Sequence, residues 1–282
     1  MRLRLDVAYD GTDFSGWAAQ PGLRTVAGVL SSALSLVFAS GVAGLTVAGR
    51  TDAGVHATGQ VCHVDVPSAS WDTLRDSLVR RLAGLLPPDV RVLAASVVPP
   101  TFDARFSALS RTYAYRVTDA PWGADPLRRH DTVAWPRSLV VSLLSQASTG
   151  LVGTHDFAAY CRRKEYGTTV RTIRRLDWAR DAAGVLVATV EADAFCQAMV
   201  RSLVGALLVV GDGRRPVDWP VGLLARTERA SEVSVAPAHG LTLVAVSYPP
   251  ESEYASRAEQ TRQRRETVVP LGQDGLRDGG VV

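Results

Sequence analysis

Cysteine is scarce in this chain of 282 residues, and the three cysteines, Cys62, Cys161 and Cys196, lie far apart in the sequence. None belongs to a CxxC pair, the spacing typical of zinc sites and of thiol redox motifs. An odd number of widely spaced cysteines does not support a disulfide framework either. We therefore expect neither a disulfide nor a cysteine-bound metal, and a reducing compartment.

Long apolar runs are also missing. The longest, residues 206–210, is far shorter than the roughly 18 residues that a membrane-spanning helix needs. The first residues, MRLRLD, contain no apolar signal-peptide core. These features predict a cytoplasmic protein with no membrane attachment. The hydrophobic content of 46% is sufficient for the cores of two domains.

Lysine is nearly absent, because Lys164 is the single lysine among 31 basic residues. The net charge of +3 is too small to indicate nucleic-acid binding by itself. One segment, however, holds seven basic residues against two acidic ones: Arg162, Arg163, Lys164, Arg171, Arg174, Arg175 and Arg180. Arginine binds phosphate through paired hydrogen bonds and stacks on bases, which suits a polyanionic partner. A solvated surface and a genome-wide preference for arginine are the alternative explanations.

Alternating apolar residues predict strands, and apolar residues three and four positions apart predict helices. The first part of the chain has the order strand, helix, strand, strand, helix, strand over residues 2–9, 26–37, 44–48, 61–66, 71–82 and 90–98. Thr25 is a candidate N-cap of the first helix. This order is typical of a split βαβ, or ferredoxin-like, unit.

The second part of the chain repeats this theme. Strands are predicted at 112–117, 171–180, 185–191 and 241–246, and helices at 138–148 and 196–210. We therefore predict an α+β protein with two ferredoxin-like domains, residues 1–105 and 106–250. Residues 251–282 are charged and poor in apolar side chains, which predicts a disordered tail.

The loop GRTDAGVH, residues 49–56, concentrates side chains capable of chemistry. Asp52 lies between two glycines, and Arg50 precedes it by two residues. A carboxylate can act as a nucleophile, and glycine lets a planar substrate approach the backbone closely. The same spacing fits a plain turn in which Arg50 forms a surface salt bridge, and the spacing alone leaves both interpretations open.

The loop GRTDAGVHA (49–57) resembles the signature loop of the tRNA pseudouridine synthase A family. Further blocks follow in family order: YDGTDFSGW (9–17), FDARFSA (102–108), RTYAY (111–115), Phe195 through MVR (199–201) to Gly205, and HGL (239–241). The sequence is identified as a member of this family from residue 3 to about residue 248. The stretch FCQA (195–198) and the extension after Pro250 depart from the family pattern.

The resemblance implies a two-domain protein packed around a central cleft, with an extended, mostly antiparallel sheet and helices on one side. It implies isomerisation of uridine to pseudouridine at positions 38, 39 and 40 of the tRNA anticodon stem-loop, by a homodimer without metal or organic cofactor. Asp52 falls on the catalytic aspartate, and Arg50 on the arginine beside it. Tyr113 falls on the tyrosine of the uridine pocket, and Arg201 on the arginine that pairs with the aspartate.

This chemistry suits the residue types. Breaking a C–N bond and forming a C–C bond to the same base requires a group that attacks and then leaves, and a carboxylate can do so at uracil C6 or ribose C1′. An arginine such as Arg201 favours the charged carboxylate, and an aromatic ring such as that of Tyr113 stacks on a flipped uracil. Contacts between the basic segment and phosphates would offset the cost of base flipping. Two alternatives remain: a paralogous synthase with other RNA targets, and a non-catalytic tRNA-binding or chaperone protein.

Overall fold

The computed structural model describes residues 1–39, 42–162 and 168–262. The first half contains β1 (Arg2–Tyr9), α1 (Val26–Phe38), β2 (Ala43–Val47), β3 (His56–Asp65), α2 (Ser68–Leu74), α3 (Leu78–Leu85) and β4 (Val90–Val98). The second half contains β5 (Ser110–Thr118), β6 (Val133–Ala134), α4 (Val141–Thr149), β7 (Gly153–Asp156), β8 (Val170–Arg180), β9 (Leu186–Ala192), α5 (Met199–Gly211), α6 (Trp219–Gly222), β10 (Leu241–Ser247) and α7 (Tyr254–Arg262).

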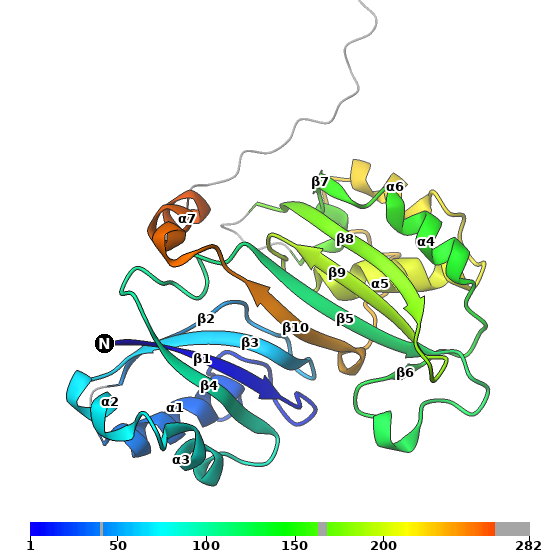
Figure 1. Ribbon diagram of the computed structural model, residues 1–282. Coiled ribbons are helices and arrows are strands. Elements are labelled where there is room, and N and C mark those ends of the chain that lie inside the picture. Colours follow the sequence, from blue (N-terminus) through cyan, green and yellow to red (C-terminus); the bar gives the residue numbers. More distant parts are fainter. Residues whose placement is uncertain (40–41, 163–167, 263–282) are drawn as a thin grey trace, which may run out of the picture.

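Ten strands form one sheet in the order β4–β1–β3–β10–β5–β9–β8–β7, with β2 paired to β3 and β6 paired to β5 (Figure 1). The pairs β10–β3 and β5–β6 are parallel, and the other pairs are antiparallel. The first half has the strand order β4–β1–β3–β2, and the second repeats it as β10–β5–β9–β8. Both orders are those of a ferredoxin-like unit, so the predicted fold class is confirmed.

The two halves join at a seam between β3 and β10. One edge of β3 is divided between two partners, because Cys62 and His63 pair with β2 whereas His56 and Ala57 pair with β10. The loop between β2 and β3, residues 48–55, therefore rejoins the sheet where the two halves meet. This topology places the signature loop at the seam.

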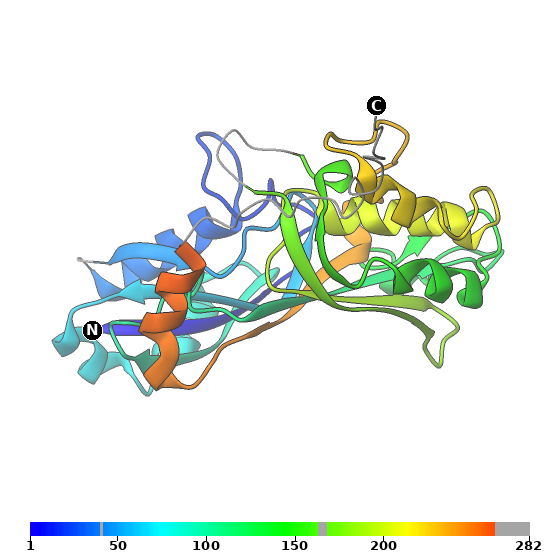
Figure 2. The ribbon, with the colours of Figure 1, turned by 90° about the horizontal axis from the view of Figure 1, so that it is seen from above.

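Most helices pack on one face of the sheet. Leu3, Leu5 and Val7 of β1 lie in the same core as the buried face of α1, and Tyr115 of β5 lies in that core with α5. Helix α7 is an exception: in Figure 2 it crosses in front of the strands of the first half, and its Tyr254 lies with Val61 and Phe102 in a second core, separate from that of α1 and α5. Within the described residues, no helix is both long and apolar enough to cross a membrane.

The first part of the predicted disordered tail is helical, which corrects that prediction for residues 251–262. A 3-10 turn at Glu251–Glu253 leads into α7, and Tyr254 and Ala258 are buried. The Tyr254 ring lies 5.0 Å from that of Phe102, in a small second core on the far face of the sheet. These apolar contacts are enough to order a charged segment. Residues 263–282 lie outside the described residues.

Two of the cysteines also depart from expectation. Cys161 and Cys196 form a disulfide, with their Cα atoms 5.6 Å apart, and Cys62 is buried as a free thiol. The amide of Arg162 donates to the carbonyl of Gln197 at 3.0 Å, so the two segments already lie side by side. The prediction of no disulfide was wrong because a sequence separation of 35 residues says nothing of this proximity. Cysteine usage therefore no longer supports the prediction of a reducing compartment.

Candidate active site

Buried polar side chains fix the signature loop through hydrogen bonds. The hydroxyls of Tyr9 and Thr51 share a hydrogen bond of 2.8 Å. Gln60, fully buried in β3, donates to the Tyr9 hydroxyl at 3.2 Å and to the Gly49 carbonyl at 2.9 Å. Burial raises the pKa of Tyr9 to about 12, so its hydroxyl stays protonated and available to this network. The loop is thus fixed without use of the Asp52 side chain.

The opening block, residues 9–17, packs directly on this loop, and two of its positions accept only glycine. A Cβ atom at Gly11 would lie 2.1 Å from the Val55 carbonyl oxygen. Gly16 has a φ of +90°, and its Cβ would lie 2.9 Å from the Thr51 oxygen. The Trp17 amide donates to that same oxygen at 3.1 Å. The two glycines bring the backbones close enough to fix the loop.

His56 connects the loop to the second half of the chain. Its Nδ1 lies 3.0 Å from the Gly11 amide and 3.0 Å from a carboxylate oxygen of Asp10. Its Nε2 lies 3.0 Å from the His239 carbonyl oxygen, which can only accept, so Nε2 carries a hydrogen. His56 therefore ties the end of the loop to the turn at Ala238–Gly240, just before β10.

Asp52 and Arg201 meet across the seam. Arg201 lies in the first turn of α5, and its Nη1 is 3.8 Å from Oδ2 of Asp52. The Asp52 side chain is 34% exposed and that of Arg201 is 20% exposed. The guanidinium is close enough to attract and orient the carboxylate, and the partial exposure leaves the carboxylate open to approach.

Tyr113 forms the buried wall next to this pair. It lies on β5 and is 8% exposed, and its ring packs edge-on against Phe195 with the centroids 5.3 Å apart. Burial raises the pKa of Tyr113, and the negative charge of nearby Asp52 raises it further, so the phenol is neutral. Phe195 belongs to the stretch that departs from the family pattern, and it contributes an aromatic contact to the site.

Arg50 does not join this cluster. It is exposed on the loop, and within residues 1–39, 42–162 and 168–262 no ion pair forms from it. The surface salt bridge that its spacing left open is therefore absent from this part of the chain.

The basic segment is partly neutralised by its own neighbours. Arg174 lies 4.0 Å from Glu191, Arg175 pairs with Asp177, and Arg180 pairs with Asp119 at 2.8 Å.

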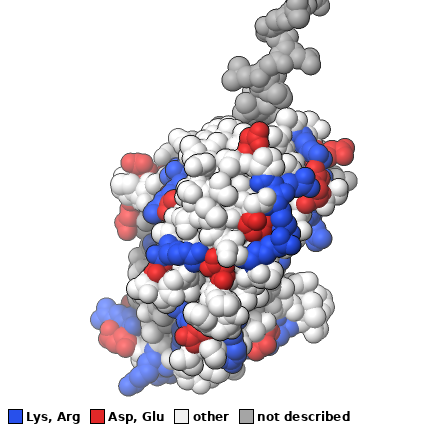
Figure 3. Space-filling model, turned by 90° about the vertical axis from the view of Figure 1, so that its right-hand side faces the viewer, with Lys and Arg blue, Asp and Glu red and all other residues white. Residues whose placement is uncertain are grey.

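The other basic residues of the segment differ in exposure. Arg162 is exposed, whereas Arg171 is half-buried and donates to the Val170 carbonyl at 2.6 Å. Arg163 and Lys164 lie outside the described residues. The face shown in Figure 3 likewise mixes basic with acidic side chains.

Sequence reasoning missed two structural supports of the site, Gln60 and Arg111. Both are polar side chains that the fold buries, at 0% and 7% exposure, and both bond to main-chain atoms at the start of the loop. No local signal marks them, because their strands, HATGQVCHVD and SRTYAYRVT, contain several other polar residues.

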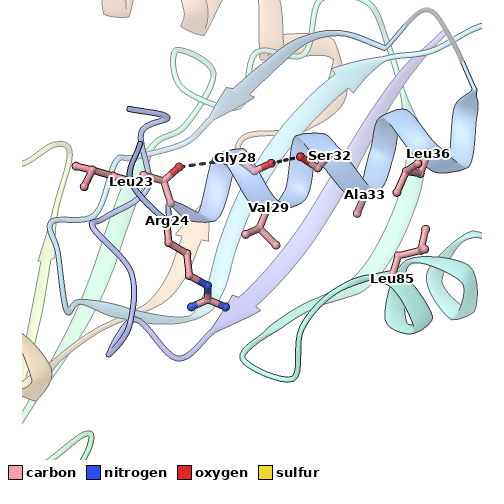
Figure 4. Close-up of a pocket in the computed structure, with 9 residues that line it drawn as sticks. Leu23, Arg24, Gly28, Val29, Ser32, Ala33, Leu36 and Leu85 are labelled. Atoms are coloured by element: carbon pink, nitrogen blue, oxygen red, sulfur yellow. Dashed lines mark hydrogen bonds between the residues drawn. The ribbon is translucent and has the colours of Figure 1, made fainter. Parts of the chain in front are cut away.

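Two hollows lie elsewhere on the surface. One of about 320 Å³ runs along α1 (Figure 4) and is lined by Leu23, Arg24, Thr25, Gly28, Val29, Ser32, Ala33, Leu36 and Leu85. Another of about 490 Å³ lies beside α7 and includes Arg2, Asp103 and Arg262 in its wall. Neither lining contains Asp52, Tyr113 or Arg201. In the described part of the chain, no group of three or more His, Cys, Asp or Glu side chains is placed to hold a metal ion.

Comparison with known proteins shows which class of protein, and which family within it, this chain resembles. A family model described as tRNA pseudouridine synthase matches residues 147–249. The tRNA pseudouridine synthase A of Frankia casuarinae is 59% identical over 272 residues, covering 96% of this chain and 98% of the relative. That of Streptomyces griseus is 54% identical, with 94% of each chain covered, and that of Mycobacterium leprae is 50% identical, with 94% of this chain and 96% of the relative covered.

The chain therefore belongs to the tRNA pseudouridine synthase A family, as the ordered sequence blocks predicted. A solved structure, the Cbf5-Nop10-Gar1 complex, aligns with 73% of this chain and 45% of its own at 11% identity and a TM-score of 0.33. The family assignment rests on the sequence relatives alone.

Proposed function

We propose that this protein isomerises uridine to pseudouridine at positions 38, 39 and 40 of the tRNA anticodon stem-loop, with Asp52 as the nucleophile. The observation that carries the proposal is the meeting of Asp52, Arg201 and Tyr113 at the seam between the two halves. The names of the relatives support tRNA as the substrate. Such an enzyme would act in the cytoplasm, where tRNA is.

The reaction is balanced without a co-reactant. The bond between N1 of uracil and C1′ of ribose breaks, and a bond between C5 and C1′ forms. The hydrogen on C5 leaves as a proton to solvent, and N1 gains a proton. Asp52 attacks C6 or C1′ and is later released, so the carboxylate is regenerated at the end of each turnover. No cofactor is needed for this exchange.

Each residue of the cluster has a role that follows from its position. Arg201 attracts and orients the carboxylate as it attacks and as it re-forms on release. Tyr113 offers a neutral aromatic wall to the uracil, held in place by the edge of Phe195. Because Asp52 lies on a loop anchored at residues 49 and 51, it can reach a flipped base without distortion of the sheet.

Base flipping needs binding energy from the rest of the tRNA. Arg50 and Arg162 are exposed arginines that can bind phosphate, and the remaining basic residues of the segment 162–175 would add to this surface. A homodimer would let one subunit hold RNA while Asp52 of the other acts on it. These contacts belong to the proposal together with the nucleophile.

Tritium release from tRNA that carries 5-tritiated uridine tests the nucleophile. We expect release by the wild-type protein and none by Asp52→Asn, while tRNA affinity stays within about tenfold because the lost group acts mainly in the transition state. The matched control is Asp76→Asn, the same substitution at a side chain that is 95% exposed between α2 and α3. Full turnover by Asp52→Asn would refute its role.

The target positions need a separate measurement. Pseudouridine mapping in the tRNA of a deletion strain should show loss at positions 38, 39 and 40, and a plasmid copy of the wild-type gene should restore it. Loss at other positions would identify a paralogous synthase. A wild-type protein that binds tRNA but releases no tritium would instead support the non-catalytic alternative.

A further inference from the structure

Arg111 lies near the start of β5 with its guanidinium buried among main-chain carbonyls. Its Nε and Nη2 donate to the Ala48 oxygen at 3.3 and 2.7 Å. Its Nη1 donates to the Asp193 oxygen at 2.8 Å, and its Nη2 also donates to the Arg105 oxygen at 2.7 Å. One side chain thus binds three segments that are distant in the sequence.

Each of these carbonyls lies next to a part of the site. Ala48 immediately precedes the signature loop that carries Asp52. Asp193 stands two residues before Phe195, whose ring contacts Tyr113, and the same segment leads into α5 with Arg201. Arg105 lies in the connection between the two halves. We propose that Arg111 is a positioning residue that sets Asp52, Tyr113 and Arg201 relative to one another; the inference rests on the proposed function.

The chemistry of the side chain explains why an arginine is needed. A guanidinium is a rigid planar fork with five donors, so it can serve three carbonyls in different directions at once. A lysine ammonium donates from a single point and cannot hold the same geometry. Arg111 also shares its strand face with Tyr113, and its positive charge acts on that phenol. The Arg111 guanidinium therefore contacts the backbone on both sides of the site, beside the signature loop at Ala48 and beside Phe195 at Asp193. It does so without facing the substrate.

The test compares Arg111→Met and Arg111→Lys with the wild-type protein, well below the unfolding temperature of each. We expect the single-turnover rate at saturating tRNA to fall about 100-fold in Arg111→Met, as misplacement of a reacting group by about 1 Å can cause. Arg111→Lys should remain at least about tenfold slow because it keeps the charge but not the fork. The affinity for tRNA should stay within about threefold in both variants, since no phosphate contact is lost.

Arg2→Met is the matched control. Arg2 donates to the carbonyls of Pro100 and Phe102 in the same connecting segment and pairs with Asp65, but it does not bond to the signature loop. Its rate should equal that of the wild type. The proposal is overturned if Arg111→Met keeps the wild-type rate, if Arg111→Lys recovers it fully, if Arg2→Met slows equally, or if both Arg111 variants fail to fold.

Hydrogen exchange separates this proposal from the proposed function, because it needs no activity. Deuterium uptake over residues 49–56 should rise in Arg111→Met, whereas uptake over α1 should not change. If the wild-type protein releases no tritium, the proposed function is refuted, and hydrogen exchange still tests whether Arg111 positions the loop. Unchanged uptake over the loop would refute positioning by Arg111 even in a fully active enzyme.

Discussion

Arg201 is held by Ala236 at two points while its guanidinium reaches Asp52. The Nε of Arg201 donates to the Ala236 carbonyl at 2.7 Å, and the Ala236 amide donates back to the Arg201 carbonyl at 3.0 Å. These two hydrogen bonds leave Nη1 of Arg201 free to approach the Asp52 carboxylate, 3.8 Å away. The cation is therefore placed by the second half of the chain for a nucleophile carried by the first.

Replacement of Arg201 should slow the chemical step. We expect Arg201→Met to lower the single-turnover rate at saturating tRNA about tenfold or more, because the Asp52 carboxylate loses the cation that orients it. The control is Arg226→Met, which removes a surface pair with Glu232 at 2.6 Å. Equal rates for Arg201→Met and the wild type would show that Asp52 does not depend on this partner.

The ring of Tyr113 should matter more than its hydroxyl. Because burial raises the pKa of Tyr113, the phenol is neutral and Tyr113→Phe changes no charge. We expect Tyr113→Phe to keep the KM for an anticodon stem-loop and Tyr113→Ala to raise it about 10- to 100-fold, matching the roughly 1–3 kcal/mol of a base stacked on an aromatic ring. Steady-state kinetics on both variants, with melting temperatures as a check of folding, measure this. Equal losses in the two variants would contradict a stacking role.

Much of the fold follows from local pattern. The alternation of Leu3, Leu5 and Val7 gives β1, and Thr25 caps α1 by accepting from the Gly28 amide at 3.2 Å. The predicted helix at 71–82 is instead two short helices, although its apolar stripe is buried as expected. The break falls at Ser77, whose hydroxyl donates to the Leu74 carbonyl at 3.3 Å and so competes with the helical pattern.

The site could be predicted only in part, because its members are close in space and not in sequence. The signature loop indicated Asp52 locally, whereas Arg201 and Tyr113 were indicated by family resemblance. The fork of Arg111 and the pairing of Cys161 with Cys196 depend on three-dimensional proximity between segments, which no local spacing shows. The same holds for α7, whose few apolar side chains find a core on the far face of the sheet.

The disulfide should stabilise the second half of the protein. Closure of a loop with a sequence separation of 35 residues predicts a gain of about 3–4 kcal/mol from the restricted unfolded chain. We expect dithiothreitol to lower the melting temperature of the wild type to that of Cys196→Ala, and to leave Cys196→Ala unchanged. Identical melting temperatures of the wild type with and without reductant would show that the bond adds no stability.

Stability should fall at acidic pH through His63. The ring is buried on β3, and its Nδ1 accepts from the Ala104 amide at 3.0 Å, which requires the neutral form. Burial lowers the pKa of His63 below its usual value of 6.5. Below pH 6.5 the unfolded chain therefore takes up a proton that the folded chain does not, and the free energy of unfolding falls as the pH falls.

Urea unfolding between pH 7.5 and pH 5 measures this effect. One proton accounts for at most about 1.4 kcal/mol per pH unit, and His63→Gln, whose side-chain oxygen can still accept from Ala104, should lose that part of the slope. His155→Gln on β7 is the matched control, since it removes a histidine whose Nε2 lies 3.2 Å from a carbonyl oxygen and which does not accept from the Ala104 amide. Carboxylates that titrate in the same range are common to both variants. If His63→Gln retains the wild-type slope, the acid sensitivity must come from other groups.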